Sequence, residues 1–220
     1  MATLPSLEHF SIKDYGSVYE PSDDTFLLCD AIFYDKDDIL ARFFQSEPIV
    51  CLEVGSGSGC VITFLSKYLK ELNIKNICYA TDINLDANQA TKRTAISNSV
   101  IVEVIRMDLV DSFIHTSSAL NKVDILLFNP PYVPTPNEEV GGCGIEAAWA
   151  GGENGRVVIN RFLPFIEKLL SAVGVCYMIL VKDNHPKEIA RILTIGGLHT
   201  KICIERQAIN EGLLVIKIWK

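Results

Sequence analysis

The stretch Asn129–Tyr132 reads Asn-Pro-Pro-Tyr and directly follows the short apolar run Val123–Phe128. Its two prolines have no backbone N–H, so the polar groups that this turn offers are mostly carbonyl acceptors. The Asn129 side chain adds one acceptor oxygen and one NH2 donor. Such a turn can accept both hydrogens of a planar NH2 group while the Tyr132 ring covers one face of that group. The stretch therefore predicts a site where an NH2 nitrogen reacts.

A second candidate site is the glycine-rich turn Gly55–Gly59, which lies between the apolar run 49–54 and a helical pattern over residues 60–72. Strand, glycine turn and helix in this order are typical of the first half of a nucleotide-binding α/β unit. Glu53 precedes the first glycine by two positions, and the spacing is Gly-x-Gly-x-Gly. A carboxylate here disfavours a pyrophosphate and favours a cation. S-adenosylmethionine carries a sulfonium and an ammonium but no phosphate, so it is the predicted ligand ahead of a dinucleotide.

Two further acidic side chains follow predicted strands. Asp82 ends the run Ile77–Thr81, where an acidic residue is placed to accept hydrogen bonds from ribose hydroxyls. Asp108 follows the run Ile101–Ile105, and a helix cap is the alternative explanation for it. Ligands of open α/β sheets bind beyond the carboxyl ends of the strands, so one crevice is expected to collect these groups.

The elements that must position these residues alternate between strand and helix. Strands are expected over residues 49–54, 77–81, 101–105, 123–128, 174–181, 198–205 and 213–219. Helices are expected from Ser22 or Asp23, over residues 60–72, from Asn84 or Asp86 to Asn98, over 155–171 with a bend at Pro164, and over 186–195. This order predicts an α/β fold with a doubly wound, seven-stranded, mostly parallel sheet and an antiparallel last strand. We expect a single domain over residues 1–220, in which an arm and helix over 1–40 cover the cofactor site.

Composition limits the class of partner and the compartment. The chain has 220 residues and a net charge of −7, so it lacks the excess of basic residues found in most nucleic-acid-binding proteins. A local basic groove remains compatible with this overall charge. Its seven cysteines show no zinc-ligand spacing, and no metal site is expected. An odd number of scattered thiols, no secretory signal and no membrane-length apolar run predict the cytoplasm, with the nucleus as a second compartment.

Several motifs together resemble a known family. They are Glu53–Gly59, Asp82, Asn129–Tyr132, the stretch Tyr19-Glu-Pro-x-x-Asp24-Thr25-Phe26, and the stretch from Gly144 through Trp149 to Arg156. In this order they resemble the eukaryotic branch of the HemK-like release-factor glutamine methyltransferases, which are class I S-adenosylmethionine-dependent enzymes of the Asn-Pro-Pro-Tyr group. The resemblance runs from about residue 18 to the C-terminus.

The resemblance implies a role for each matched position. Cofactor contacts are implied for Tyr19, Thr25, Glu53, Gly55, Gly57, Asp82, Asp108, Leu109 and Asn129. Substrate contacts are implied for Asn129, Pro130, Pro131 and Tyr132. In the mechanism expected from the turn itself, the Asn129 side-chain oxygen and the Pro130 carbonyl accept both amide hydrogens while Tyr132 packs on the amide plane. Catalysis then consists of positioning and electrostatic stabilisation without a strong base.

The resemblance also implies a substrate and a partner. The substrate would be the glutamine of the Gly-Gly-Gln loop of the eukaryotic class I release factor, with protein lysine as a further activity of the family. The partner would be a small zinc-binding activator protein, for which we predict docking at the apolar edge strand Ile101–Ile105, unless residues 1–17 cover that edge. Other hypotheses are an N6-adenine nucleic-acid methyltransferase, a dehydrogenase, and a binding module that is not catalytic by itself.

Overall fold

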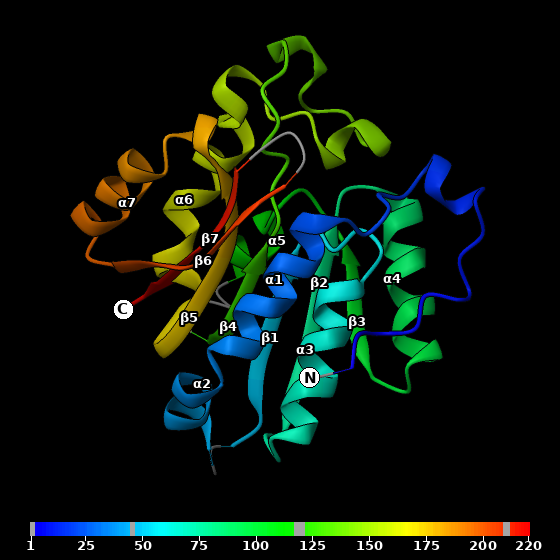
Figure 1. The fold of residues 1–220 in the computed structure, drawn as a ribbon, viewed down its shortest axis with the longest axis vertical. Helices are drawn as coiled ribbons and strands as arrows, with labels where there is room; N and C mark the ends of the chain where they lie inside the picture. Colours follow the sequence, from blue (N-terminus) through cyan, green and yellow to red (C-terminus); the bar gives the residue numbers. More distant parts are fainter. Residues whose placement is uncertain (1–2, 45–46, 117–121, 209–211) are drawn as a thin grey trace.

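The structure, a computed structural model, describes residues 3–44, 47–116, 122–208 and 212–220. Seven strands form one sheet in the order β3-β2-β1-β4-β5-β7-β6 (Figure 1). Their bounds are β1 Ile49–Val54, β2 Asn76–Asp82, β3 Val102–Arg106, β4 Val123–Phe128, β5 Leu170–Val181, β6 His199–Gln207 and β7 Gly212–Trp219. Strands β1 to β5 pair in parallel, whereas β7 is antiparallel to both β5 and β6. The predicted fold class is confirmed; the predicted connection 206–212 lies partly outside the described residues.

Seven α-helices of the described residues flank the sheet in two layers. They are α1 Asp23–Tyr34, α2 Lys36–Phe43, α3 Cys60–Glu71, α4 Leu85–Ser97, α5 Asp111–Thr116, α6 Val157–Leu169 and α7 Pro186–Ile195. Parallel crossovers are right-handed, and the chain moves outward through β2 and β3, then returns to the middle at β4 and continues to the other edge. Helices α3 and α4 therefore cover one face together with α1, which packs on α3, while α5, α6 and α7 cover the other.

The start of β5 differs from the prediction. Helix α6 gives way directly to β5 at Leu170, whereas the sequence pattern predicts helix through Ser171 and strand only from Gly174. The register between β4 and β5 shifts between Val123, which pairs with Leu170, and Ile125, which pairs with Val175, so three more residues of β5 than of β4 lie between these pairs. This irregularity is created by pairing with the neighbouring strand, so no periodicity within the segment announces it.

Helices α2 and α5 do not follow from the sequence pattern. Each is too short to show a convincing helical period, and short helices depend on tertiary contacts. For α2 that contact is visible, because the buried Lys217 ammonium on β7 forms ion pairs with Asp35 and Asp38 at the start of the helix. A partner so distant in the sequence cannot be read from the local pattern.

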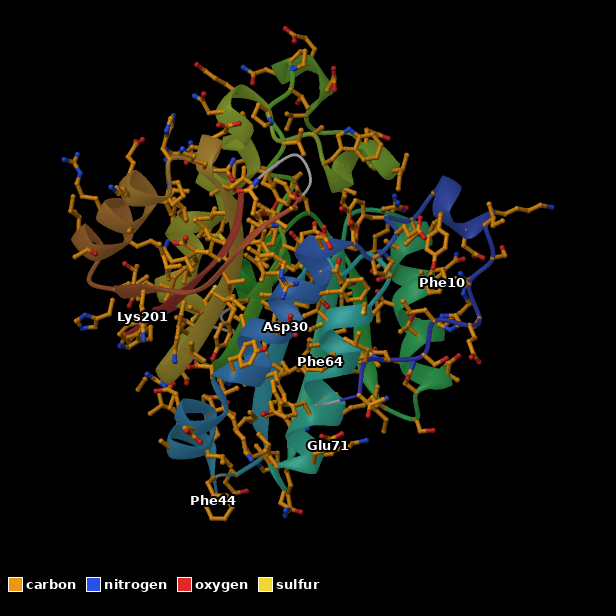
Figure 2. All side chains as sticks on the ribbon, viewed as in Figure 1. Phe10, Asp30, Phe44, Phe64, Glu71 and Lys201 are labelled. Atoms are coloured by element: carbon orange, nitrogen blue, oxygen red, sulfur yellow. The ribbon has the colours of Figure 1, made fainter. Side chains whose placement is uncertain are left out.

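The N-terminal arm lies along helix α4. The Asn98 side chain exchanges two hydrogen bonds with the backbone of Ser6, of 2.8 and 2.9 Å, and Asp14 forms an ion pair with Arg93. Phe10 lies beside α4, with the Arg93 guanidinium 5.5 Å from its ring centre (Figure 2). Strand β3 is the sheet edge, and no described residue pairs with its outer side. The arm is therefore laid over α4, and residues 3–17 add no strand to the β3 edge.

Candidate active site

A cavity of about 150 Å³ lies at the carboxyl ends of strands β1 to β4. Ten of the predicted site residues line it, namely Tyr19, Thr25, Glu53, Gly55, Gly57, Asp82, Asp108, Leu109, Asn129 and Pro131. Pro130 and Tyr132 are buried behind this lining. The topology therefore brings together side chains that are more than a hundred residues apart in the sequence.

The turn after β1 forms the floor of the cavity. Gly55 and Gly57 have φ angles of +66° and +53°, a conformation that side chains with a Cβ rarely adopt. The Gly57 backbone N–H donates to the Asp82 carboxylate at 2.9 Å, which ties the turn to the end of β2. These glycines leave backbone exposed where a ligand can approach closely.

Glu53 is buried at 2% exposure in β1, directly below the turn. Its carboxylate accepts a hydrogen bond of 2.9 Å from the backbone N–H of Ile62, in the first turn of α3. The residue that precedes α3, Gly59, has no side chain to cap the helix, so Glu53 supplies an acceptor from the neighbouring strand. Burial raises the pKa of Glu53 well above its ordinary value, and the nearby Asp82 carboxylate raises it further. A cationic ligand group would relieve this cost.

Asp82 is held rigidly at the end of β2. Its two carboxylate oxygens accept hydrogen bonds of 2.9 Å from the backbone N–H groups of Gly57 and Asn84. Burial raises the pKa of Asp82, whereas these backbone donors lower it. Each oxygen keeps a second lone pair, so the carboxylate can also accept from ligand hydroxyls, as predicted for ribose.

Asp108 and Leu109 lie on the opposite wall. An Asp108 carboxylate oxygen is 2.6 Å from Arg161 on α6, and both side chains are partly exposed. This ion pair was not predicted, and it leaves one Asp108 oxygen for a ligand amino group. Leu109 has a φ of +49°, and its carbonyl accepts a hydrogen bond of 2.9 Å from Thr81. That bond fixes the strained residue that forms this wall.

Asn129 projects from the end of β4. Its NH2 group donates to the Asp24 carboxylate at 2.9 Å. Its carbonyl oxygen Oδ1 is buried and has no hydrogen-bond partner among the described residues. A buried acceptor without a partner costs about 1–3 kcal/mol, and a ligand hydrogen bond is one way to offset that cost. The atom predicted to accept a substrate NH2 hydrogen is thus the one left free.

Asp24 at the start of α1 is a site residue without a predicted role. It is 3% exposed, and the same carboxylate oxygen that binds Asn129 also accepts from the hydroxyls of Tyr132 (3.2 Å) and Tyr19 (3.3 Å). Asp24 lies within the motif that carries the resemblance, so the sequence marks its position. Its partner Asn129 is 105 residues away, which is why the contact itself is invisible in the sequence.

Asn184 is a second such residue, and it lies just after β5. Its side chain is fully buried; its oxygen accepts from the Val181 backbone N–H at 2.8 Å, and its NH2 group donates to the carbonyls of Tyr132 and Asn154, both at 2.9 Å. Gly155 packs so closely that a Cβ there would lie 1.8 Å from the Tyr132 carbonyl oxygen. Asn184 therefore holds the Asn-Pro-Pro-Tyr turn against the next segment of chain, and no sequence motif indicated it.

The loop over residues 133–155 closes the site from above (Figure 1). An isolated parallel β-bridge joins Val133, near the start of the loop, to Ala150. The 3-10 turn Ile145–Ala148 contributes to the lining of the cavity. Trp149 follows this turn and is 37% exposed. The loop therefore forms part of the wall of the cavity.

The charges around the cavity fit a cationic ligand better than a pyrophosphate. Three carboxylates line it, those of Glu53, Asp82 and Asp108. Arg161 is the one cationic side chain among the described lining residues, and its charge is already paired with Asp108. Across the described part of the chain, no cluster of His, Cys, Asp or Glu is arranged to hold a metal ion. No helix within the described residues is long and apolar enough to span a membrane.

Comparison with known proteins decides the family. The family model described as "Methyltransferase small domain" matches residues 36–185. The chain is 44% identical to "Methyltransferase HEMK2" of Homo sapiens over 212 residues, which is 96% of this chain and 94% of that protein. The chain belongs to the HemK-like methyltransferases. It is an enzyme of this family, as its motifs predict.

Two further relatives refine this placement. The methyltransferase is 34% identical to "eRF1 methyltransferase catalytic subunit mtq2" of Schizosaccharomyces pombe over 226 residues, covering 100% of this chain and 96% of that one. Its fold is similar to the methyltransferase in the solved E. cuniculi Mtq2-Trm112 complex, described as methylating the eRF1 translation termination factor. The TM-score is 0.65 at 28% identity, with 92% of this chain and 98% of that chain covered.

Proposed function

We propose that this methyltransferase transfers a methyl group from S-adenosylmethionine to the side-chain amide nitrogen of the glutamine in the Gly-Gly-Gln loop of a class I translation release factor. It does so as the catalytic subunit of a complex with a small zinc-binding activator. The relatives named for eRF1 methylation support this substrate. The observation that carries the proposal is the buried, unpaired Oδ1 of Asn129 at the carboxyl end of β4.

The Asn-Pro-Pro-Tyr turn explains how a weak nucleophile is used. An amide lone pair is delocalised into its carbonyl, so the nitrogen must be held with that lone pair directed at the methyl carbon. Asn129 Oδ1 and the Pro130 carbonyl accept the two hydrogens of the substrate NH2 group, and the Tyr132 ring packs on the amide plane. The nitrogen would gain the methyl carbon as the bond to sulfur breaks, which leaves the neutral thioether of S-adenosylhomocysteine, and it would release one proton to solvent. Positioning of this kind can supply several kcal/mol of the barrier reduction without a strong base.

The cofactor assignment rests on the donors and acceptors of the cavity. Glu53 would lie near the methionine part with its ammonium, Asp82 would accept from the ribose hydroxyls, and Asp108 and Leu109 would contact the adenine. Tyr19 and Thr25 would cover the cofactor from the N-terminal arm. When bound, S-adenosylmethionine would supply an activated methyl group on a positively charged sulfur, and three carboxylates line the cavity that would hold it.

Replacement of Asn129 by Ala tests the proposal. The variant keeps Glu53 and Asp82, so it should bind S-adenosylhomocysteine within about threefold of the wild type. It should lose methyl transfer by at least about a hundredfold, a loss comparable to that for other preorganised groups at a reacting centre. Turnover is measured by mass spectrometry of release factor methylated by the enzyme co-expressed with its activator.

Substrate controls separate the classes of methyltransferase. The release factor with its Gly-Gly-Gln glutamine replaced by Ala should accept no methyl group, and duplex DNA should accept none. Wild-type turnover by Asn129→Ala would contradict the mechanism. Methylation of DNA but not of release factor would replace the proposed substrate by an adenine NH2 group.

The activator is proposed to bind along β3. This strand is a sheet edge, and Ile101 beside it is 81% exposed, as is Ile96 at 77%. An exposed apolar edge strand invites pairing with another chain. The complex of a similar methyltransferase with Trm112 supports a partner of this kind.

A further inference from the structure

We propose that Asp24 is a positioning residue that fixes which end of the Asn129 amide faces the substrate. The inference rests on the proposed function, because it concerns the acceptor that would hold the substrate nitrogen. It starts from a property of every asparagine: the oxygen and the NH2 group are similar in size, so packing alone hardly distinguishes the amide from its flipped form.

Asp24 distinguishes the two forms by charge. Its Oδ2 is 2.9 Å from Asn129 Nδ2, and an ionised carboxylate accepts but cannot donate. Rotating the amide by half a turn would place Asn129 Oδ1 against this carboxylate, with two oxygens in contact and no hydrogen between them. Asp24 is 3% exposed, so water would not screen the repulsion.

The orientation matters because of what lies at the other end of the amide. In the observed form the buried Oδ1 is left as a free acceptor for a substrate hydrogen. In the flipped form the NH2 group of Asn129 would meet the NH2 group of the substrate, donor against donor. The flipped site could neither hold the nitrogen nor direct its lone pair.

Asp24 also joins the cofactor side of the site to the substrate side. The oxygen that receives Asn129 also accepts from the Tyr132 hydroxyl at 3.2 Å and from the Tyr19 hydroxyl at 3.3 Å. The other Asp24 oxygen accepts from the Thr25 backbone N–H at 2.7 Å. Tyr19 and Thr25 line the cofactor cavity, so one carboxylate contacts groups on both sides, and an Asn at this position would keep an oxygen for the donors on the cofactor side.

A simpler explanation is that Asp24 only stabilises the N-terminus of α1, where acidic residues are favourable. The neighbouring Asp23 occupies the same helical turn but is exposed. Asp23→Asn removes the same charge without touching the site, so it is the matched control for Asp24→Asn.

The test compares four variants with the wild type, each co-expressed with the activator. Asp24→Asn can present its own NH2 group to Asn129, which allows the flipped form. Its kcat for release factor should fall by about tenfold or more, the loss expected for a charge-assisted hydrogen bond, while the Kd for S-adenosylhomocysteine changes by less than about threefold. Asp23→Asn should keep kcat within about twofold of the wild type.

The exchange of the two residues provides a rescue. Asn129→Asp alone places two carboxylates side by side and should be nearly inactive. Combined with Asp24→Asn, it restores a donor facing an acceptor and leaves a carboxylate oxygen toward the substrate. The double variant should therefore recover at least about fivefold in kcat over Asn129→Asp, a coupling typical of residues in direct contact.

The outcomes distinguish this inference from the proposed function. If the wild type methylates release factor but Asp24→Asn keeps the wild-type kcat, or if the double variant is no better than Asn129→Asp, then Asp24 does not orient the amide. If the wild type does not methylate release factor, the proposed function fails first. If Asp24→Asn alone does not fold, the double variant tests the same contact with donor and acceptor exchanged, and a double variant that folds no better than Asp24→Asn, or is no more active than Asn129→Asp, contradicts the inference.

Discussion

At the scale of single residues, the site is built from carboxylates that are costly to bury. Glu53 is the clearest example, because burial raises its pKa well above the ordinary value while one N–H of α3 compensates in part. A folded protein that holds such a carboxyl binds more protons than the unfolded chain does at the same pH. Its free energy of unfolding therefore falls as pH rises from the unfolded pKa, near 4.5, through the raised folded pKa.

Glu53→Gln should remove the pH dependence of stability that comes from the Glu53 carboxyl. As pH rises from about 4.5 through the raised folded pKa, the melting temperature of the ligand-free wild type should drop relative to that of Glu53→Gln. The two proteins should differ least near pH 4.5. The measurement is thermal unfolding of both proteins over a series of pH values. Parallel curves would show that Glu53 does not titrate in this way.

The same variant should bind the cofactor product less tightly. S-adenosylhomocysteine keeps the ammonium group, and ionised Glu53 binds it best, so wild-type affinity should rise with pH through the raised pKa. Glu53→Gln should lose about tenfold in affinity at the upper end of this range and show little dependence on pH. Affinity measured by calorimetry at several pH values checks this.

The sequence predicts that a residue belongs to the site where that residue stands at the end of a strand. Glu53, Asp82 and Asn129 stand at ends of apolar runs, and parallel strands bring such ends to one edge. Asp24 and Asn184 act through partners 105 and 52 residues away, and Asp108 pairs with Arg161 on another helix. Contacts of this kind depend on packing between elements, so no local spacing reveals them.

At the scale of elements, strands β1 and β4 have the predicted bounds, because both are buried apolar runs that end at turn residues. The helices α2 and α5 and the early start of β5 depend on neighbouring elements and were not predicted. The link between the end of β5 and the Asn-Pro-Pro-Tyr turn belongs to the same class. It consists of one fully buried side chain, Asn184, which binds three segments of backbone.

Asn184→Asp should break this link. The carboxylate still accepts from Val181, but it faces the carbonyls of Tyr132 and Asn154 without a donor. Leaving these buried groups unsatisfied should destabilise the protein by about 2 kcal/mol or more. Turnover should fall more than the affinity for S-adenosylhomocysteine, because the turn carries the substrate site.

Asn98→Asp is the matched control for this change. Asn98 also donates to backbone carbonyls, those of Ser6 and Thr94, but it follows the C-terminal end of α4, at the edge of the sheet away from the site. Its variant should lose stability without a selective loss of turnover. Chemical denaturation and steady-state kinetics give both quantities. Equal effects of the two variants on turnover would mean that Asn184 has no special connection with the turn.

At the scale of the whole molecule, the sheet has two free edges of different character. The outer strand β6 carries exposed charged residues, including Lys201 and Glu205, which discourage pairing with another chain. The outer strand β3 presents Val102 and Val104, half-buried, beside the exposed Ile101. The N-terminal arm lies on α4 and leaves the β3 edge open within residues 3–17. Strand β3 carries exposed charges of its own, Glu103 and Arg106, so the proposal of a partner at this edge rests on the exposed Ile101 beside it and on the complex of the similar methyltransferase.

Charged substitutions on the two edges should therefore have opposite outcomes. Val104→Lys, or the milder Ile101→Asp at a position outside the strand, should weaken binding of the activator by about tenfold or more, because a charge at the interface must lose its hydration without gaining a partner. Ile202→Lys on β6, where the side chain is 45% exposed, should leave binding unchanged. Co-purification of each variant with the activator, followed by titration of the separated subunits, measures this. If the β3 variants still bind the activator, or if Ile202→Lys is the variant that loses binding, then the activator does not dock on β3.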